Sequence, residues 1–521
     1  MTISDDIVDE YELSPVQEGM LFHSLCSPNT GVYIQQIVVT LHDALDLDLF
    51  KQAWQLILDR HTVLRTSFLH ADLDRPVQRV HRTASLEIVE HDWNACDEAT
   101  AGIRLDRFLA ADKAVDFELD KAPLMRMAIL QLSPNDCHIV WTFHHALMDG
   151  RSFPIILQEL FAIYDSLQQS EQLQLSDPQP YKLFIEFLRD QDQQKERVFW
   201  EKHLSGYKGD INLSAHNLRS AQAMGKVDPG RQEKVLPATL ASAMESFAKR
   251  SNLTLSTLLQ AAWALFLSRY CNRQDIVFGV TRACRRSAPQ WAESMIGLFI
   301  NTLPLRIQVR SDESALTLLR DLRASGIEMR DHEHTPLTKI YAWSGIPAER
   351  SLFDSIVVFE NYSLNDLLQS QGGSWTKREF RSISYTNYAL TLAAYARPRF
   401  LLQVLYDRRD FDDEAVVRIL EFIQITLESL IQRSELSLAK LPELGIARPA
   451  ATADRGDEGS PFGTHGNRGD PCEDSTVSAG AGRVAGQRAA LLAERAKLSP
   501  EQRVLLEQRL SGSSERTSRS K

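Results

Sequence analysis

Apolar residues recur with helix-like and strand-like periodicity from about residue 11 to residue 444, with no long polar gap. This continuity constrains the fold more than any other feature, because it requires a packed core along more than four fifths of the chain. Residues 138–143 are short and rich in aromatic and β-branched side chains, which predicts a buried strand. Further strands are predicted at 275–280, 356–359 and 400–405, with amphipathic helices between them.

This alternation predicts an α/β fold with two similar lobes of roughly 200 residues each. We place the N-terminal lobe at residues 1–185 and the C-terminal lobe at residues 186–446. A cleft between two lobes is a usual place for a functional site.

The chain beyond the lobes has a different composition. Residues 447–487 are rich in Gly, Ala, Ser, Asp and Pro and almost lack large apolar residues, which predicts a disordered linker. Residues 488–521 begin with helix formers and a series of leucines, which predicts an amphipathic helical tail. This tail either binds a groove of a partner or is dispensable.

Composition excludes several classes of protein. Among 521 residues, 58 Lys and Arg face 69 Asp and Glu, so the net charge is −11. With 43% hydrophobic residues the chain is neither wholly disordered nor fibrous. It has no long basic run for nucleic acid, no apolar segment of membrane-spanning length and no N-terminal secretory signal. We therefore expect a cytoplasmic, monomeric protein with neither nucleic acid nor membrane as a partner.

The six cysteines are scattered, without a CxxC pair or a histidine at zinc spacing. This spacing predicts neither a disulfide framework nor a structural metal site.

Three helix starts carry capping signals. Ser14, followed by Pro15 and by Gln17, has the pattern of a capping box. Asp48 is expected to cap a second helix, and Ser152 a third.

The sharpest motif is His-His-Ala-Leu-Met-Asp-Gly at residues 144–150, between the strand at 138–143 and the helix after Ser152. A loop at this place holds an imidazole rigidly, and Gly150 permits a tight exit of the backbone. Asp149 can turn back to fix the loop, or bind a cation. Adjacent histidines on an extended segment point to opposite sides, which disfavours a shared metal ion. The competing interpretation is that His145 is a buried structural histidine and Asp149 a turn residue.

This segment resembles the HHxxxDG signature of the chloramphenicol acetyltransferase-like acyltransferases. The chain looks specifically like a condensation domain of nonribosomal peptide synthesis, because further motifs follow in order between about residues 10 and 445. They lie at residues 13–23, 60–68, 296–302, 332–337, 353–355 and 359–362.

The resemblance implies two chloramphenicol acetyltransferase-like lobes in a V-shaped pseudo-dimer with an interlobe tunnel. It gives the catalytic role to His145, with the remaining motif residues His144, Asp149 and Gly150 around it.

It also implies residues that shape the site. Arg285 would pair with Asp149, but Cys284 replaces the glycine usual before that arginine, which leaves Arg282 and Arg286 as rivals. Asn301 would line the tunnel, and Ser14 would stand near it as a helix cap.

The implied reaction is transfer of an acyl or aminoacyl group from the phosphopantetheine thioester of a donor carrier protein. The acceptor is an amine or a hydroxyl, on a second carrier protein or on a free small molecule, and the chain itself binds no cofactor. The alternatives are a coenzyme A-dependent acyltransferase of the same fold, a catalytically silent recruitment domain, and a membrane-anchored glycerolipid-type acyltransferase. The chain has neither an adenylation signature nor a carrier serine motif, so we expect it to work in trans, either as a free-standing protein, which we favour, or as a module excised from a larger synthetase.

Overall fold

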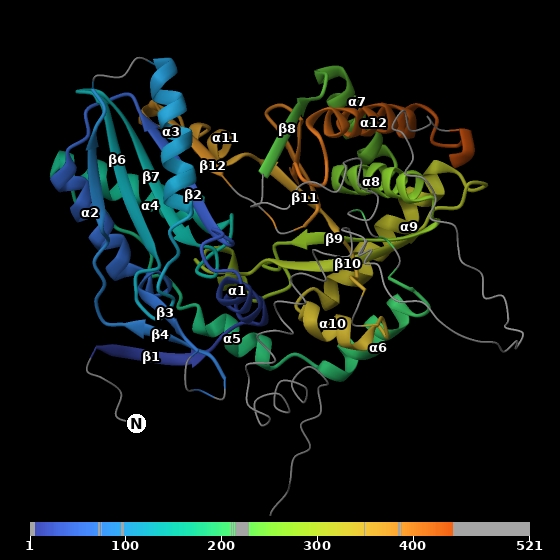
Figure 1. Ribbon diagram of the computed structural model, residues 1–521, viewed down its shortest axis with the longest axis horizontal. Coiled ribbons are helices and arrows are strands. Elements are labelled where there is room, and N and C mark those ends of the chain that lie inside the picture. The colour runs from blue at the N-terminus through green and yellow to red at the C-terminus, as the bar shows by residue number, and fades with distance from the viewer. Residues whose placement is uncertain are drawn as a thin grey trace, which may run out of the picture.

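The computed structural model describes residues 6–440 except 71–72, 74, 95–97, 210, 212, 214–228, 348–349, 384–385 and 387. Figure 1 shows these residues gathered in two lobes, each built from a sheet with helices against it. The linker predicted at 447–487 and the tail predicted at 488–521 lie outside the described residues.

Strands and helices alternate along both lobes, as the periodicity predicts. The first group of elements is β1 (Ile7–Glu12), α1 (Pro15–Cys26), β2 (Ile34–Leu41), α2 (Leu47–Arg60), η1 (Thr62–Arg65), β3 (Thr66–Leu69), β4 (Val77–His81), β5 (Ile88–Asp92), α3 (Glu98–Lys113), β6 (Met125–Ser133), β7 (Asp136–His144), α4 (Ser152–Gln169), α5 (Lys182–Arg189) and α6 (Gln193–Leu204).

The second group follows from residue 229. It consists of β8 (Pro229–Val235), α7 (Ala238–Arg250), α8 (Leu255–Cys271), β9 (Asp275–Arg282), η3 (Gln290–Glu293), β10 (Asn301–Gln308), α9 (Ala315–Glu328), η4 (Met329–His332), α10 (Leu337–Trp343), β11 (Ser355–Tyr362), α11 (Leu364–Gln369), η5 (Gly373–Lys377), β12 (Arg378–Ile383), β13 (Leu390–Arg397), β14 (Leu401–Asp407), α12 (Asp413–Gln432) and η6 (Leu438–Lys440).

The first lobe is centred on a five-stranded sheet of order β12-β2-β7-β6-β5. Both faces of β7 are covered. Ile139 and Trp141 enter the cluster that includes residues of α2 and α4, whereas Val140 enters a smaller cluster with Leu105 and Leu109 of α3. Burial on both faces explains why the sequence of this strand is a continuous apolar run.

Strand β12 joins the first lobe from the second half of the sequence. It pairs antiparallel with β2, from Arg378 opposite Leu41 to Ile383 opposite Gln36. The division at residue 185 therefore does not describe the lobes, because part of the range 186–446 completes the sheet of the first one. A strand that completes a distant sheet carries no signal of its partner in the sequence.

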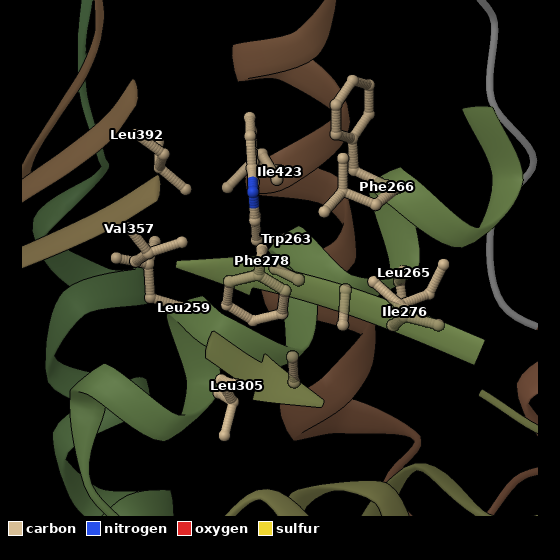
Figure 2. Packing of buried hydrophobic residues seen from close by; sticks show 14 of the residues in the cluster. Leu259, Trp263, Leu265, Phe266, Ile276, Phe278, Leu305, Val357, Leu392 and Ile423 are labelled. Carbon is tan, nitrogen blue, oxygen red and sulfur yellow. The ribbon is translucent and has the colours of Figure 1, made fainter. Parts of the chain in front are cut away.

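The second lobe has a six-stranded sheet of order β10-β9-β11-β13-β14-β8. Helix α8 packs against it, and Trp263 is fully buried among Phe278, Val357 and Leu392 (Figure 2). The indole Nε1 of Trp263 donates to the hydroxyl of Ser355 at 3.1 Å, so this buried indole donor is paired. Within the described residues, no helix combines the length and the apolar character that crossing a membrane requires.

Of the three helix caps predicted from the sequence, the structure confirms one. Ser14 and Gln17 form the expected capping box, with Oγ of Ser14 3.2 Å from the Gln17 amide nitrogen. Asp46, and not Asp48, caps α2, because only its carboxylate lies before the first turn and faces the free amides. Ser152 does not cap α4, and its hydroxyl has another use at the site.

Gly279 allows the close approach of β9 to its neighbours. A Cβ atom there would lie 2.5 Å from the ring of Phe353 and 2.7 Å from Ile356. Gly279→Ala should therefore lower the free energy of unfolding by about 1–3 kcal/mol, the usual cost of overpacking a core. Gly102→Ala on the exposed face of α3, where a Cβ meets no atom within 4 Å, is the control and should stabilise by up to about 1 kcal/mol. Equal unfolding midpoints of the two variants in urea would contradict this account of the β9 packing.

Candidate functional site

The HHxxxDG segment forms the connection from β7 to α4. Strand β7 ends at His144 and α4 begins at Ser152, so the motif occupies the turn between a buried strand and a buried helix. The backbone amide of His145 donates to the carbonyl of Tyr33 at 2.7 Å, which anchors the turn to the segment before β2. Tyr33 adopts a left-handed conformation with φ of 59°, a strained geometry that concentrates at functional sites.

His144 is a structural residue of the first lobe. Its Nδ1 accepts from the Ala146 amide at 3.2 Å, and its Nε2 lies 3.0 Å from the hydroxyl of Ser24 on α1. Burial, and secondarily the charge of His145, lowers its pKa to about 3. His144 is therefore neutral, and its one proton lies on Nε2.

His145 has the opposite tautomer. Its Nδ1 lies 2.8 Å from the carbonyl oxygen of Met148, and a carbonyl can only accept, so Nδ1 carries the proton. Burial lowers the pKa of His145 below its usual value. The hydrogen bond to Met148 raises this pKa, but its effect is smaller than that of burial. The ring is therefore neutral near pH 7 and leaves a free lone pair on Nε2, the arrangement that a general base requires.

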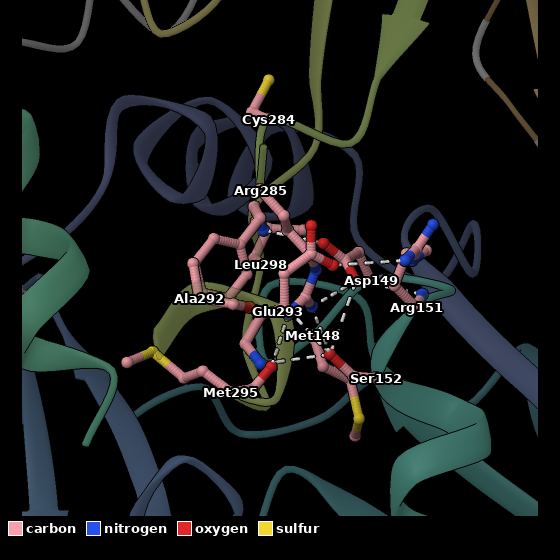
Figure 3. Close-up of polar contacts among 12 residues, drawn as sticks. Met148, Asp149, Arg151, Ser152, Cys284, Arg285, Ala292, Glu293, Met295 and Leu298 are labelled. Carbon is pink, nitrogen blue, oxygen red and sulfur yellow. Dashed lines mark hydrogen bonds and ion pairs between the residues drawn. The ribbon is translucent and has the colours of Figure 1, made fainter. Parts of the chain in front are cut away.

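Asp149 and Arg285 form the buried ion pair that the family resemblance implies. The guanidinium Nη2 lies 3.0 Å from the carboxylate, and the two side chains are 1% and 0% exposed (Figure 3). Arg285 also donates to the carbonyls of Ala292 and Met295, both at 2.6 Å, and lies over the ring of Phe299 at 4.1 Å. The carboxylate accepts in addition from the Phe299 amide at 2.8 Å. Both carboxylate oxygens and both Nη groups thus have partners, as a buried ion pair requires, and only the Nε of Arg285 has none among the described residues.

Ser152 links the same loop to the second lobe. Its hydroxyl donates to the carbonyl of Gly297 at 3.0 Å and accepts from the Gly297 amide at 3.1 Å. A Cβ at residue 297 would lie 2.5 Å from an atom of the Tyr181 ring, whose hydroxyl donates to Leu298. Glycine is therefore required here for close approach. The sequence predicted Ser152 only as a cap, because contacts between distant loops leave no local pattern.

The geometry decides among the three arginines. Arg282 donates to the carbonyl of Gly326 at 2.9 Å, and Arg286 is exposed, which leaves Arg285 as the partner of Asp149. Cys284 has φ of 50°, in the left-handed region where glycine is favoured. This conformation explains why a glycine is usual at that position.

A cavity of about 290 Å³ lies between the lobes beside this ion pair. Its lining includes Gly150 and Arg151 from the first lobe and residues of β9, η3, η4 and β11 from the second. The backbone does turn tightly here, because the Ser152 amide donates to the carbonyl of Asp149 at 2.9 Å. Gly150 has room for a Cβ and no left-handed φ, so this turn does not require a glycine. Asn301 does not line the cavity. Its amide instead donates to the carbonyls of Glu333 and Thr335, because Asn301 starts β10 beside that turn.

Among the described residues, His, Cys, Asp and Glu side chains nowhere gather in a group of three that would hold a metal ion. Sequence reasoning singled out Glu360 only as part of a motif. The structure places it in the lining of the cavity.

Two lobes, each with a sheet and helices packed against it, place the chain in the class of two-lobed α/β proteins. The family model of the condensation domain matches residues 7–445, so the chain belongs to the condensation domain family. Condensation domains of nonribosomal peptide synthetases are acyl-transferring enzymes that form amide bonds.

Two curated relatives illustrate the similarity. The chain is 32% identical to tyrocidine synthase 2 of Brevibacillus parabrevis over 84% of its own length and 12% of the relative. It is 30% identical to surfactin synthase subunit 3 of Bacillus subtilis (strain 168), over 83% of the chain and 34% of the relative. The chain thus spans only a small part of the length of these relatives.

Solved structures show the same fold. The condensation domain from monacolin K polyketide synthase MokA matches with a TM-score of 0.69 at 16% identity, over 84% of this chain and 100% of that one. The starter condensation domain of rhizomide synthetase RzmA matches with a TM-score of 0.68 at 19% identity, again over 84% and 100%.

Removing one charge of the buried pair should destabilise the protein. Asp149→Ala leaves Arg285 buried without its carboxylate, and the expected loss is about 3–5 kcal/mol in the free energy of unfolding. The control is Glu201→Ala, which breaks an exposed pair with Arg197 and should cost no more than about 0.5 kcal/mol. If Asp149→Ala keeps its full stability in urea but loses activity, Asp149 takes part in the chemistry instead.

Proposed function

We propose that the chain joins an acyl or aminoacyl thioester to an amine, and that His145 is the catalytic residue. The single observation that carries this proposal is the tautomer of His145. The carbonyl of Met148 holds the proton on Nδ1, and the lone pair of Nε2 stays free for a substrate proton.

The reaction needs one proton to move. The amine nitrogen attacks the carbonyl carbon of the thioester, the bond from that carbon to sulfur breaks, and an amide forms. Nε2 of His145 accepts the proton that the nitrogen loses and returns it to the departing thiolate. A neutral amine attacks readily once it is positioned, so positioning contributes beside base catalysis. A hydroxyl acceptor, which gives an ester, depends more strongly on the base.

The substrates would be presented on phosphopantetheine arms of carrier proteins, with a free small-molecule amine as an alternative acceptor. In this proposal the donor and acceptor arms reach His145 through a tunnel between the lobes. The interlobe cavity beside Asp149 and Arg285 supports this path because both lobes line it, and Gly150 of the motif is in that lining while His145 is not. Here the carriers would be separate domains or separate proteins.

The function is tested by mixing the protein with acyl-pantetheine thioesters and amine acceptors and measuring amide formation by mass spectrometry. Amide formation above the uncatalysed rate supports the proposal. No turnover with any donor, including donors loaded on carrier proteins, would favour a recruitment domain.

His145→Ala should lower kcat/KM by about 10²- to 10⁴-fold, the usual contribution of a positioned acid-base group. Its melting temperature should stay near that of the unmodified protein, because the side chain has one hydrogen bond to a backbone carbonyl. His144→Ala is the matched control and should lower stability more and activity less, since His144 is buried and bonded at both nitrogens. A rate for His145→Ala within a few-fold of the original would exclude the assignment.

The pH profile should follow His145. A base works without its proton, and burial lowers the pKa of His145, so the fall in kcat/KM on acidification should have its midpoint below about pH 6.5. The acceptor must be an amine whose own pKa lies lower still. His144, with a pKa of about 3, does not titrate in this window. Burial raises the pKa of the Glu360 carboxyl to about 7, so the profile is also measured in Glu360→Gln, in which this carboxyl no longer titrates. A midpoint above about pH 6.5 in both proteins would contradict the assignment.

A further inference from the structure

The cavity between the lobes opens where two parallel strands separate. Strands β9 and β11 pair only at Gly279 with Ile356 and at Val280 with Val357. Beyond these pairs, residues 281–286 and 358–361 line the cavity from its two sides. Crevices beyond the carboxyl ends of parallel strands are the usual ligand sites of α/β folds.

Glu360 lies in this gap, three residues beyond the last pair of β11 with β9. Its side chain is partly buried and lines the cavity. Among the described residues no hydrogen bond or ion pair to its carboxylate is formed. Removing an ionised carboxylate from water without a hydrogen-bond donor is costly. Burial therefore favours the protonated form of Glu360 and raises its pKa.

Most charged neighbours in the cavity are directed elsewhere, although Arg151 also attracts the Glu360 carboxylate from beyond ion-pair distance. Arg151 lies 3.4 Å from Glu293, and Arg282 binds the carbonyl of Gly326. Arg285 is held by Asp149. The cavity lining also contains Arg286, Arg330 and Glu333. Both of these arginines are exposed. Among the described residues, Glu360 is thus the carboxylate of the lining that has no hydrogen bond or ion pair, and so it can accept one from a ligand.

We infer that Glu360 binds the ammonium group of an aminoacyl substrate and so selects substrates with a free amino group. This inference rests on the proposed function, because it assigns the substrate class at the cavity through which that function brings its substrates. An ammonium group has three N–H donors and forms charge-assisted bonds with a carboxylate. A fatty acyl or N-acylated group has no such donor. The ammonium group belongs either to the donor aminoacyl group or to an acceptor that binds in its protonated form and loses that proton before it attacks, and both present the same chemistry to Glu360.

Binding is measured by calorimetry with three hydrolysis-resistant pantetheine amides: alanyl, propionyl and N-acetylalanyl. The alanyl compound should bind about 10- to 100-fold more tightly than the propionyl compound, the range of a hydrogen bond to a charged group. Glu360→Gln should reduce this ratio to within about threefold while leaving the affinity for the propionyl compound unchanged. Glu293→Gln, an exposed carboxylate of the same cavity, is the matched control and should keep the ratio.

Several results would overturn the inference. If Glu360→Gln weakens the alanyl and propionyl compounds equally, or the original protein does not prefer the alanyl compound, Glu360 binds no ammonium group. If Glu293→Gln abolishes the preference as Glu360→Gln does, the effect comes from the charge of the cavity as a whole.

Kinetics then identify the source of the ammonium group. A KM for the aminoacyl donor that rises in Glu360→Gln assigns it to the donor, and a raised KM for the acceptor assigns it to the acceptor. Binding needs no turnover, so a preference that depends on Glu360 without amide formation would refute the proposed function and leave the inference standing.

Discussion

The buried ion pair of Asp149 with Arg285 is the interaction on which the site depends. Two opposite charges can lie in a protein interior only when nearly every hydrogen-bonding direction around them is filled. Here this demand is met by backbone groups of the second lobe, including the carbonyl of Ala292 and the amide of Phe299. The turn that carries His145 is therefore held by the second lobe as well as by its own sheet, and the position of the imidazole reports how the lobes fit together.

In the same turn, two neighbouring histidines differ in their hydrogen bonds and therefore in the position of the ring proton. An amide, that of Ala146, donates to His144, and a carbonyl, that of Met148, accepts from His145. Since burial keeps both rings neutral, these two backbone groups place the protons on opposite nitrogens. Backbone geometry thus gives one ring to the fold and leaves the other available for chemistry.

The sequence predicted what depends on local pattern. The buried strand before His144, the capping box at Ser14 and the two α/β lobes follow from periodicity and capping chemistry. The pairing of Asp149 with Arg285 came from the family resemblance, since a gap of 136 residues has no periodicity. The use of Ser152, the placement of β12 and the cavity position of Glu360 were not predictable, because each depends on which distant segments meet.

The placement of β12 bears on how such proteins can be recombined. A chimaera that takes its first lobe from one relative and its second from another would seem to need a single crossover point between them. Strand β12 defeats that plan, because the donor of the second lobe would also supply an edge strand to a foreign sheet, opposite β2. Side chains on both faces of that strand, among them Phe380 and Ile383, would then meet a core that did not evolve with them. A chimaera therefore has to exchange both lobes together. Alternatively it needs three junctions, so that the segment around β12 comes from the same relative as the first lobe.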